Sequence, residues 1–328
     1  MKILYAIQGT GNGHISRARE IVPLLQNYGD VELLISGTQS DVHLMQQINY
    51  RFHGFSFIFG KKGGVDHYNT WKTMDLPDFV RDMRKIPLSS YNLIINDFEP
   101  VTAWACKLGK VESVGMSHQA SFSSRNVPIP NTKDWTKLVL KYYAPSKNAV
   151  GFHFDRYDDF IHTPVIRSEI RRLTKENLGH YSVYLPALAD KWLIPILKAV
   201  PDVNWQVFSK HSKTTYFDGN VQVSPVNNER FNLSLASCEG LLTGGGFEGP
   251  SEALFLGKKL LVVPMNFQYE QQCNAYALEQ FGIPVIWSKT KNWVPIIRDW
   301  VKSEQKHHFK FPDETAGLID KVVKQFAR

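Results

Sequence analysis

Short apolar runs alternate with amphipathic segments along the first half of the chain. KILYAIQ (2–8), VELLIS (31–36) and LIIND (93–97) have the near-continuous apolar character of strands that are buried on both faces. Between the first two runs, apolar residues from 15 to 25 recur with the spacing of one helix face. Strands that alternate with helices predict an α/β fold built on a doubly wound parallel sheet.

The same alternation begins again after Pro164. Further strand candidates in this half are SVYLPA, WQVFS, VQVSP, GLLTGG and KLLVVP. A chain of 328 residues also exceeds the size at which a single core usually keeps growing. We therefore expect two Rossmann-like domains that face each other across a cleft, residues 1–158 and 159–328, with the linker between Gly151 and Pro164.

Composition narrows the class of protein. A hydrophobic share of 43% and a charged share of 21% are those of an ordinary globular chain. The apolar run near the N-terminus is too short for a signal peptide, and no apolar stretch approaches the roughly 18 residues of a membrane span. Three cysteines without metal-ligand spacing indicate a reduced, cytoplasmic chain. The net charge of +7 suits an anionic substrate or surface, or is incidental, and no nucleic-acid motif accompanies it.

The strongest functional signal is a run of glycines between an apolar strand and a helix. Gly244, Gly245 and Gly246 follow GLLT, and Glu248 and Glu252 come near the start of the helix. Glycines let the backbone approach a ligand closely, and a helix N-terminus offers free N–H groups and partial positive charge. Together these features predict a phosphate or diphosphate site. The Gly-Lys-Ser/Thr of a nucleoside-triphosphate loop is missing, which argues against triphosphate hydrolysis.

Polar side chains near this loop suit sugar hydroxyls. Glu270 and Gln271 introduce the next helix with one carboxylate and one amide. Glu252 offers a second carboxylate, which can accept hydrogen bonds from a ribose diol. Phosphate and polyol recognition together predict a nucleotide-sugar ligand. For Glu270 and Gln271, a solvated loop is the alternative.

The glycine turn near the N-terminus is a weaker signal. Gly9 and Gly11 begin a dinucleotide-binding pattern, but His14 stands where its third glycine belongs and no acidic residue closes the next strand. A histidine at a helix start is suited to removing a proton from an acceptor hydroxyl. The alternative is a histidine that only caps the helix. We predict that Gly11, Gly13 and His14 border the acceptor.

Polar residues also follow the next two strands. Asp97 and Glu99 follow the third apolar run, and His118 and Gln119 end the strand after it. Ligands in open α/β sheets bind at the carboxyl ends of the strands, so Asp97 and His118 are candidates for the acceptor side. The D-x-E pair also suits a divalent cation or the N-cap of the following helix, and a lone histidine there is more often structural. Arg167 either reaches a phosphate or is a surface residue.

Three of these segments resemble one group of enzymes. TGGGFEGPSEALFLGKKLLVVP, YEQQCNAYAL and GTGNGHISRA are similar to the glycine loop, the acidic and glutamine element and the N-terminal loop of nucleotide-sugar glycosyltransferases with the GT-B fold. The resemblance is to the family 28-like branch, which includes the lipid II-forming transferase and the plant galactolipid synthases, and to an uncharacterised subgroup. It covers both domains in order and spacing.

The resemblance implies a role for each matching residue of the second domain. Gly244 to Gly246 and the following helix would hold the donor diphosphate, and Glu252 would bind the ribose. Glu270 and Gln271 would bind the donor sugar, and the backbone around Val226 would read the nucleobase.

Two departures from the family pattern bear on the mechanism. Leu185-Pro186-Ala187 replaces the family's glycine-rich entry to the second domain, so diphosphate contacts from that loop are not expected. Glu248 and Glu252 are four positions apart, closer than the glutamate pair of a retaining subgroup, which favours inversion.

The expected function is therefore an inverting glycosyltransferase that uses neither a metal nor a cofactor. The second domain would bind a UDP-sugar as donor, the first domain would bind the acceptor, and His14 would act as general base near the reacting centre. Two alternatives share the scaffold. A nucleotide-sugar 2-epimerase needs no acceptor, and a non-catalytic protein would bind the nucleotide sugar without turnover.

Two segments raise the question of a membrane. Trp135 to Lys147 and Trp287 to Lys310 mix basic and aromatic residues, which suits the headgroup layer of an anionic membrane. A lipid-linked acceptor at the inner face of the membrane would explain why the protein contacts the membrane. Packing of these aromatic side chains against the first domain or across the cleft between the domains is the alternative.

Overall fold

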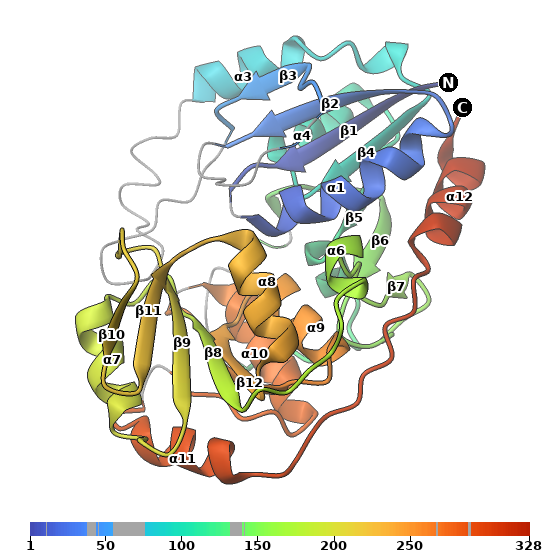
Figure 1. Ribbon diagram of the computed structural model, residues 1–328. Coiled ribbons are helices and arrows are strands. Elements are labelled where there is room, and N and C mark those ends of the chain that lie inside the picture. The colour runs from blue at the N-terminus through green and yellow to red at the C-terminus, as the bar shows by residue number, and fades with distance from the viewer. Residues whose placement is uncertain are drawn as a thin grey trace.

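The computed structural model describes residues 1–10, 12–37, 44, 46–54, 76–131, 140, 142–266, 268–287 and 290–328. The chain forms two α/β halves, each built around its own sheet (Figure 1). This arrangement confirms the predicted fold class. Gly11 and, within the segment from Trp135 to Lys147, residues 135–139 and 141 lie outside the described residues.

The first sheet has seven strands, all parallel, in the order β3-β2-β1-β4-β5-β6-β7. These strands are β1 (Lys2–Gln8), β2 (Asp30–Ser36), β3 (Tyr50–Phe52), β4 (Leu93–Asp97), β5 (Val114–Ser117), β6 (Asn148–Phe152) and β7 (Ile161–His162). The helical segments of this half are α1 (Asn12–Gln26), α3 (Leu76–Arg84), η1 (Leu88–Ser90), α4 (Pro100–Gly109) and η2 (Gln119–Ser123). Every residue of β4 is buried, as its apolar sequence predicts.

The second sheet has six strands in the order β10-β11-β9-β8-β12-β13, and only β10 runs antiparallel to its neighbour. These strands are β8 (His180–Tyr184), β9 (Asn204–Ser209), β10 (Tyr216–Asp218), β11 (Val221–Pro225), β12 (Gly240–Gly244) and β13 (Lys259–Val263). The helices are α6 (Ser168–Arg171), α7 (Asp190–Lys198), α8 (Asn228–Ser237), α9 (Glu248–Phe255), α10 (Tyr269–Gln280), α11 (Val294–Lys302) and α12 (Thr315–Phe326).

Two boundaries differ from the sequence prediction. β7 pairs with β6 in the first sheet, so that sheet continues past the expected division between 158 and 159. The strand expected to end in His118 and Gln119 ends earlier, at Ser117. Ser117 Oγ accepts a hydrogen bond from Ala120 N at 3.0 Å, which turns the chain into η2.

The C-terminal helix α12 returns to the first half and packs against α1, close to the N-terminus (Figure 1). Tyr28 Oη donates a hydrogen bond to Asp320 Oδ1 at 3.1 Å across this contact. One cluster of buried apolar side chains also runs through both halves, and it includes Phe152 of β6 and Phe247 just before α9. The two halves are therefore joined by packing as well as by the linker.

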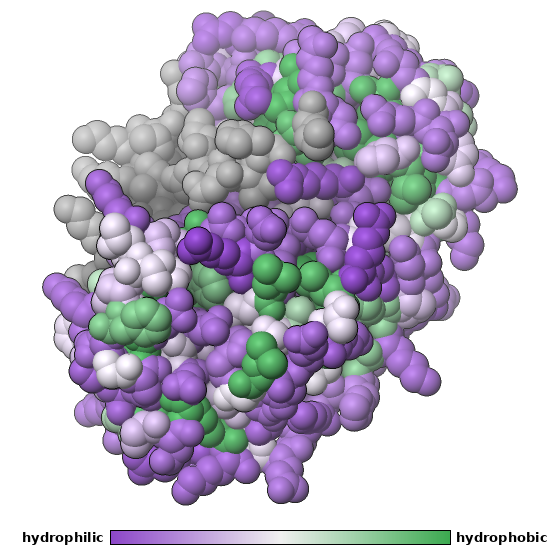
Figure 2. All heavy atoms as spheres, viewed as in Figure 1, coloured by the Kyte–Doolittle hydropathy of each residue, from purple (hydrophilic) through white to green (hydrophobic). Residues whose placement is uncertain are grey.

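The basic, aromatic segment after Trp287 is partly internal. Ile297 and Trp300 of α11 are buried among side chains of the second half, whereas the packing alternative placed the aromatic residues against the first domain or across the cleft. The face in Figure 2 is largely hydrophilic, with apolar residues gathered in small areas. Among the described residues, no helix combines the length and apolarity that a membrane crossing needs.

Candidate active site

The end of β4 and the start of α1 meet at the junction of the two halves. β1 and β4 are neighbours, with Ile7 opposite Asp97, so the helix that follows β1 begins beside the end of β4. His14, in the first turn of α1, has Nδ1 2.7 Å from Asp97 Oδ1. Asp97 is fully buried, and His14 is nearly so. Two of the predicted site residues therefore form a direct pair.

The protonation of this pair follows from its surroundings. Burial alone would raise the pKa of Asp97, but Arg17 and His14 together outweigh burial and lower that pKa. The carboxylate is therefore ionised and can only accept hydrogen bonds, so Nδ1 of His14 carries the proton that it donates to Oδ1. When Nδ1 carries the only ring proton, Nε2 keeps its lone pair, which is the requirement for a general base.

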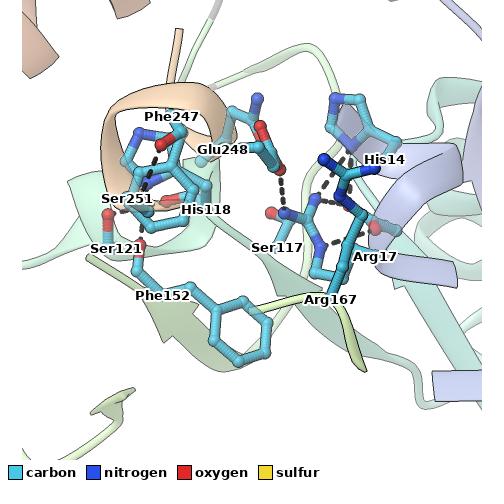
Figure 3. Close-up of polar contacts among 12 residues, drawn as sticks. His14, Arg17, Ser117, His118, Ser121, Phe152, Arg167, Phe247, Glu248 and Ser251 are labelled. Atoms are coloured by element: carbon cyan, nitrogen blue, oxygen red, sulfur yellow. Dashed lines mark hydrogen bonds and ion pairs between the residues drawn. The ribbon is translucent and has the colours of Figure 1, made fainter. Parts of the chain in front are cut away.

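Arg17 also binds this pair, and the sequence analysis did not identify it. Its Nε and Nη2 donate to the two oxygens of Asp97 at 3.0 and 2.7 Å. Its Nη1 donates to Glu248 Oε1 at 2.8 Å (Figure 3). The buried guanidinium thus joins α1 of the first half to α9 of the second. Its position three residues after His14, on the same face of the helix, is the signal that could have found it.

Gly13 makes this approach of Glu248 possible. A Cβ at Gly13 would overlap the carboxylate of Glu248. The carboxylate lies beside the first turn of α1, where free N–H groups and the helix dipole favour negative charge. Gly13, predicted to border the acceptor, thus contacts the helix that follows the second half's glycine loop.

Two glycines of the loop between β12 and α9 differ in their surroundings. Gly245 N donates to Gln271 Oε1 at 3.2 Å, and a Cβ at Gly245 would lie 2.6 Å from the carbonyl oxygen of Gln271. A Cβ at Gly246 would meet no atom within 4 Å. Gly245 is therefore required by packing against α10, whereas Gly246 leaves open space beside the start of α9.

A cavity of about 300 Å³ lies beside this loop. Gly244, Gly246 and Gln271 line it, together with the loop Leu185-Pro186-Ala187 after β8 and the ring of Trp293. The loop that departs from the family pattern therefore borders the same space as the glycines. Four other predicted donor residues, Gly245, Glu252, Glu270 and Val226, are not among the residues that line this cavity.

Glu252 is held in a buried ion pair. Arg167 donates through Nε to Oε1 at 2.5 Å and through Nη2 to Oε2 at 2.8 Å. Burial raises the pKa of Glu252, and Arg167 opposes this effect. Arg167 is therefore not a surface residue, and it occupies both oxygens that were expected to accept from a ribose. Val226 follows β11 and is 43% exposed.

The start of α10 is tied to the first half by two hydrogen bonds. Gln119 Nε2 donates to Glu270 Oε2 at 2.9 Å, and Nε2 of His118 lies 2.7 Å from Asn274 Oδ1. The other ring nitrogen of His118 lies 2.7 Å from the carbonyl oxygen of Phe152, so both nitrogens are engaged (Figure 3). His118 thus contacts the opposite half through its ring.

Glu99 is the N-cap of α4. Its carboxylate accepts hydrogen bonds from Val101 N at 2.7 Å and Thr102 N at 2.6 Å. The capping alternative for the D-x-E pair therefore applies to Glu99, while Asp97 binds Arg17 and His14. Within the described part of the chain, no group of three or more His, Cys, Asp or Glu side chains is arranged to hold a metal ion.

Residues 1–302 match the sequence model of a family described as Glycosyl transferase family 1. No curated protein matches the chain by sequence. Among solved structures, MurG of Acinetobacter baumannii is similar, with 15% identity, a TM-score of 0.62 and 99% of both chains covered.

Two other similar structures contain ligands. UGT89C1 of Arabidopsis thaliana, complexed with UDP, has 11% identity and a TM-score of 0.56, with 99% of this chain and 95% of that chain covered. The spinosyn rhamnosyltransferase SpnG, complexed with spinosyn aglycone, has 12% identity and a TM-score of 0.56, with 100% and 97% covered. At these identities the likeness concerns the fold.

Proposed function

This chain belongs to glycosyl transferase family 1, and we propose that it moves a sugar from a UDP-sugar to an acceptor hydroxyl with inversion at the anomeric carbon. Its fold is that of the GT-B glycosyltransferases. In the proposal the donor binds to the second half and the acceptor to the first. The observation that carries it is the His14–Asp97 pair, 2.7 Å apart at the junction of the two halves.

The proposed donor site is the cavity beside the glycine loop. Gly246 leaves open space and α9 begins two residues later, so a diphosphate can approach backbone N–H groups and the positive end of a helix. UDP is the ligand in two similar structures, which supports a uridine donor. Gln271 lines the same cavity and is proposed to contact the sugar, with Glu270 beside it.

The proposed roles of Glu252 and Val226 rest on the resemblance of the motifs. Glu252 would bind the ribose only by sharing its carboxylate with Arg167, because both oxygens already accept from that side chain. The backbone beside Val226 would contact the base, and Val226 N donates to the Ser209 carbonyl oxygen at 3.2 Å.

In the proposed reaction, Nε2 of His14 takes the proton of the acceptor hydroxyl as the hydroxyl oxygen attacks the anomeric carbon. The bond from that carbon to the diphosphate breaks on the opposite face, so the configuration inverts. Asp97 orients the ring and stabilises the imidazolium that forms. The negative charge that develops on the leaving UDP is stabilised by loop N–H groups and the start of α9, and the proposal uses neither a metal nor a cofactor.

The test is incubation of the full chain with UDP-glucose, UDP-galactose and UDP-N-acetylglucosamine and a set of alcohols, followed by NMR of the products. We expect a β-linked product from the α-linked donor. UDP at one hundred times its dissociation constant should also stabilise the fold by about 2.7 kcal/mol. Conversion of the donor to a 2-epimer without acceptor would establish the epimerase instead. Donor binding without turnover on any alcohol would establish a binding protein.

A cytoplasmic location, a lipid-linked acceptor and contact with the inner face of a membrane remain predictions. Sedimentation with anionic and neutral vesicles at low salt tests the membrane contact. Salt-sensitive binding to anionic vesicles alone would support it. Equal and negligible binding to both would contradict it and favour an acceptor in solution.

A further inference from the structure

Glu248 is the first residue of α9, and its side chain reaches across the junction of the two halves. Its Oε1 accepts a hydrogen bond from Arg17 Nη1 at 2.8 Å (Figure 3). Two residues before it, Gly246 lines the cavity beside the glycine loop. The side chain of Glu248 therefore connects the start of the helix that follows the glycine loop with the first half of the molecule.

Two neighbouring residues hold the start of α9 against the first half. Phe247 is buried, and its ring stacks on that of His118 with the centroids 3.8 Å apart. Glu248 comes close to the first turn of α1 because Gly13 has no side chain, and a Cβ at Gly13 would lie 2.3 Å from Glu248 Oε2. The position of the Glu248 carboxylate beside Arg17 therefore depends on contact between the two halves.

Arg17 connects this contact to the proposed base. Its guanidinium is planar and its side chain is only 2% exposed. Nε and Nη2 hold the two oxygens of Asp97, while Nη1 holds Glu248. Nη2 also lies 3.1 Å from His14 Nδ1. A rigid group with these contacts cannot turn without moving the carboxylate of Asp97, which orients the ring of His14.

Loss of the acceptor at Glu248 would leave Nη1 of Arg17 without this hydrogen bond. A buried N–H group without an acceptor is unfavourable, so the guanidinium should turn to reach water or another acceptor. The turn would shift the carboxylate of Asp97 and, through it, the ring of His14. Misplacement of a reacting group by about 1 Å can lower a rate by about a hundredfold, so a small shift is enough to affect turnover.

We propose that Glu248 is a positioning residue: by holding Arg17 it sets the orientation of the His14–Asp97 pair, which is therefore complete only when the second half is in contact with the first. The inference rests on the proposed function, because His14 is the base of that reaction. The reach of the Glu248 side chain carries the role rather than its charge, since Asp97 already balances the charge of Arg17.

Two substitutions in the full chain separate reach from charge. Glu248→Gln is the conservative variant, because it keeps the length of the side chain and an oxygen that can accept from Nη1. Glu248→Asp keeps the charge but is one methylene shorter and falls short of Nη1. We expect turnover to fall by about tenfold to a hundredfold in Glu248→Asp and to stay within about fivefold of wild type in Glu248→Gln. Calorimetry should give UDP affinities within about threefold of wild type for both variants.

An NMR signal tests the same geometry without turnover. The proton between His14 Nδ1 and Asp97 Oδ1 should give a far-downfield imidazole N–H resonance, which is identified by its absence from His14→Ala. We expect Glu248→Asp to shift or broaden this resonance and Glu248→Gln to keep it. Glu229→Ala, at an exposed position in the first turn of α8, should keep both the wild-type signal and wild-type turnover. Thermal unfolding shows whether each variant is folded, and Glu248→Ala replaces Glu248→Asp if the latter is not.

The other outcomes contradict the inference in separate ways. An unchanged signal in Glu248→Asp, or no such signal in the wild type, would mean that Glu248 does not position the pair. An equal or greater loss in Glu248→Gln than in Glu248→Asp would assign the role to charge. A loss of UDP affinity as large as the loss of turnover would place Glu248 in the donor site. Failure of the proposed function would appear separately, as a lack of UDP binding or of sugar transfer while the signal still responds to Glu248→Asp.

Discussion

Asp97 binds three side chains at once. Its Oδ1 lies 2.7 Å from both His14 Nδ1 and Arg17 Nη2, and its Oδ2 accepts from Arg17 Nε at 3.0 Å and from Tyr5 Oη at 3.3 Å. A fully buried carboxylate is tolerated only when such partners offset the loss of water. The same contacts orient the imidazole. A substitution of Asp97 would therefore change catalysis and stability together. Substitutions of His14 and of Arg17 allow the two effects to be measured separately.

The first prediction concerns His14. His14→Ala leaves the Asp97–Arg17 pair in place, so turnover should fall by about 10²–10⁴-fold, the usual contribution of a general base. UDP affinity should change by less than about threefold. Steady-state kinetics and calorimetry measure the two effects, and His308→Ala, at an exposed position, is the control. Near wild-type turnover in His14→Ala would reassign His14 to a helix cap.

The second prediction concerns Arg17. Arg17→Met leaves the buried carboxylate of Asp97 without its cation, and breaking such a pair costs about 3–5 kcal/mol of unfolding free energy. Urea denaturation measures this loss. Arg19→Met, two residues along at an exposed position of α1, should cost less than about 1 kcal/mol. A similar small loss for both variants would mean that the ion pair contributes little to stability.

At the scale of elements, the turn between β12 and α9 combines a packing contact with an open approach. Gly245 lies against Gln271 of α10, and Gly246 faces open space. The two positions are adjacent, so substitutions there share the same local sequence. They differ in whether the new methyl group meets protein or the proposed diphosphate.

The third prediction compares these two glycines. Gly245→Ala places its Cβ 2.6 Å from the Gln271 carbonyl oxygen and should destabilise the fold by about 1–3 kcal/mol. Gly246→Ala should leave stability within about 1 kcal/mol but weaken UDP binding by about tenfold, because the methyl group keeps the diphosphate from the backbone. Thermal unfolding and calorimetry measure these effects. Unchanged UDP affinity in Gly246→Ala would place the diphosphate elsewhere.

Central elements are predictable from the sequence, and several edges and partners are not. β4 and β12 are apolar runs because parallel strands are buried on both faces. β10, a short strand at a sheet edge with two exposed residues, carries no such pattern.

In the site, GHISR and the glycine run indicate the right segments. They do not indicate that Arg17 meets residues 80 and 231 positions away, or that Arg167 meets Glu252 85 positions away. Such pairings depend on how the two halves assemble.

At the scale of the whole molecule, the two halves are tied together beside the proposed reacting centre. Arg17 binds Glu248, and Gln119 binds Glu270. The ring of His118 stacks on Phe247 with centroids 3.8 Å apart and an angle of 5° between the ring planes. Each contact joins the first half to a residue just after the glycine loop or at the start of α10. Changes that loosen this junction should therefore affect stability and both substrates.

The junction also makes stability depend on pH. His153 is fully buried beside His118, and burial, followed by the charge of His118, holds the pKa of His153 well below its ordinary value. Above about pH 6.5 the ring is neutral in the folded and the unfolded chain, so it adds no pH dependence. Below that pH the unfolded chain binds a proton that the folded chain does not, and stability falls by up to about 1.4 kcal/mol per pH unit.

The fourth prediction follows from this sign. His153→Asn keeps an acceptor for Phe154 N, which now donates to Nδ1 of His153 at 2.9 Å, but removes the titrating group. The loss of unfolding free energy between pH 6.5 and pH 5.5 should therefore be smaller in the variant by up to about 1.4 kcal/mol. Urea denaturation at pH 7.5, 6.5 and 5.5 measures the slope. His308→Asn, at an exposed position, should keep the wild-type slope. An unchanged slope in His153→Asn would mean that the buried ring takes up a proton in the folded protein and that the junction tolerates its charge.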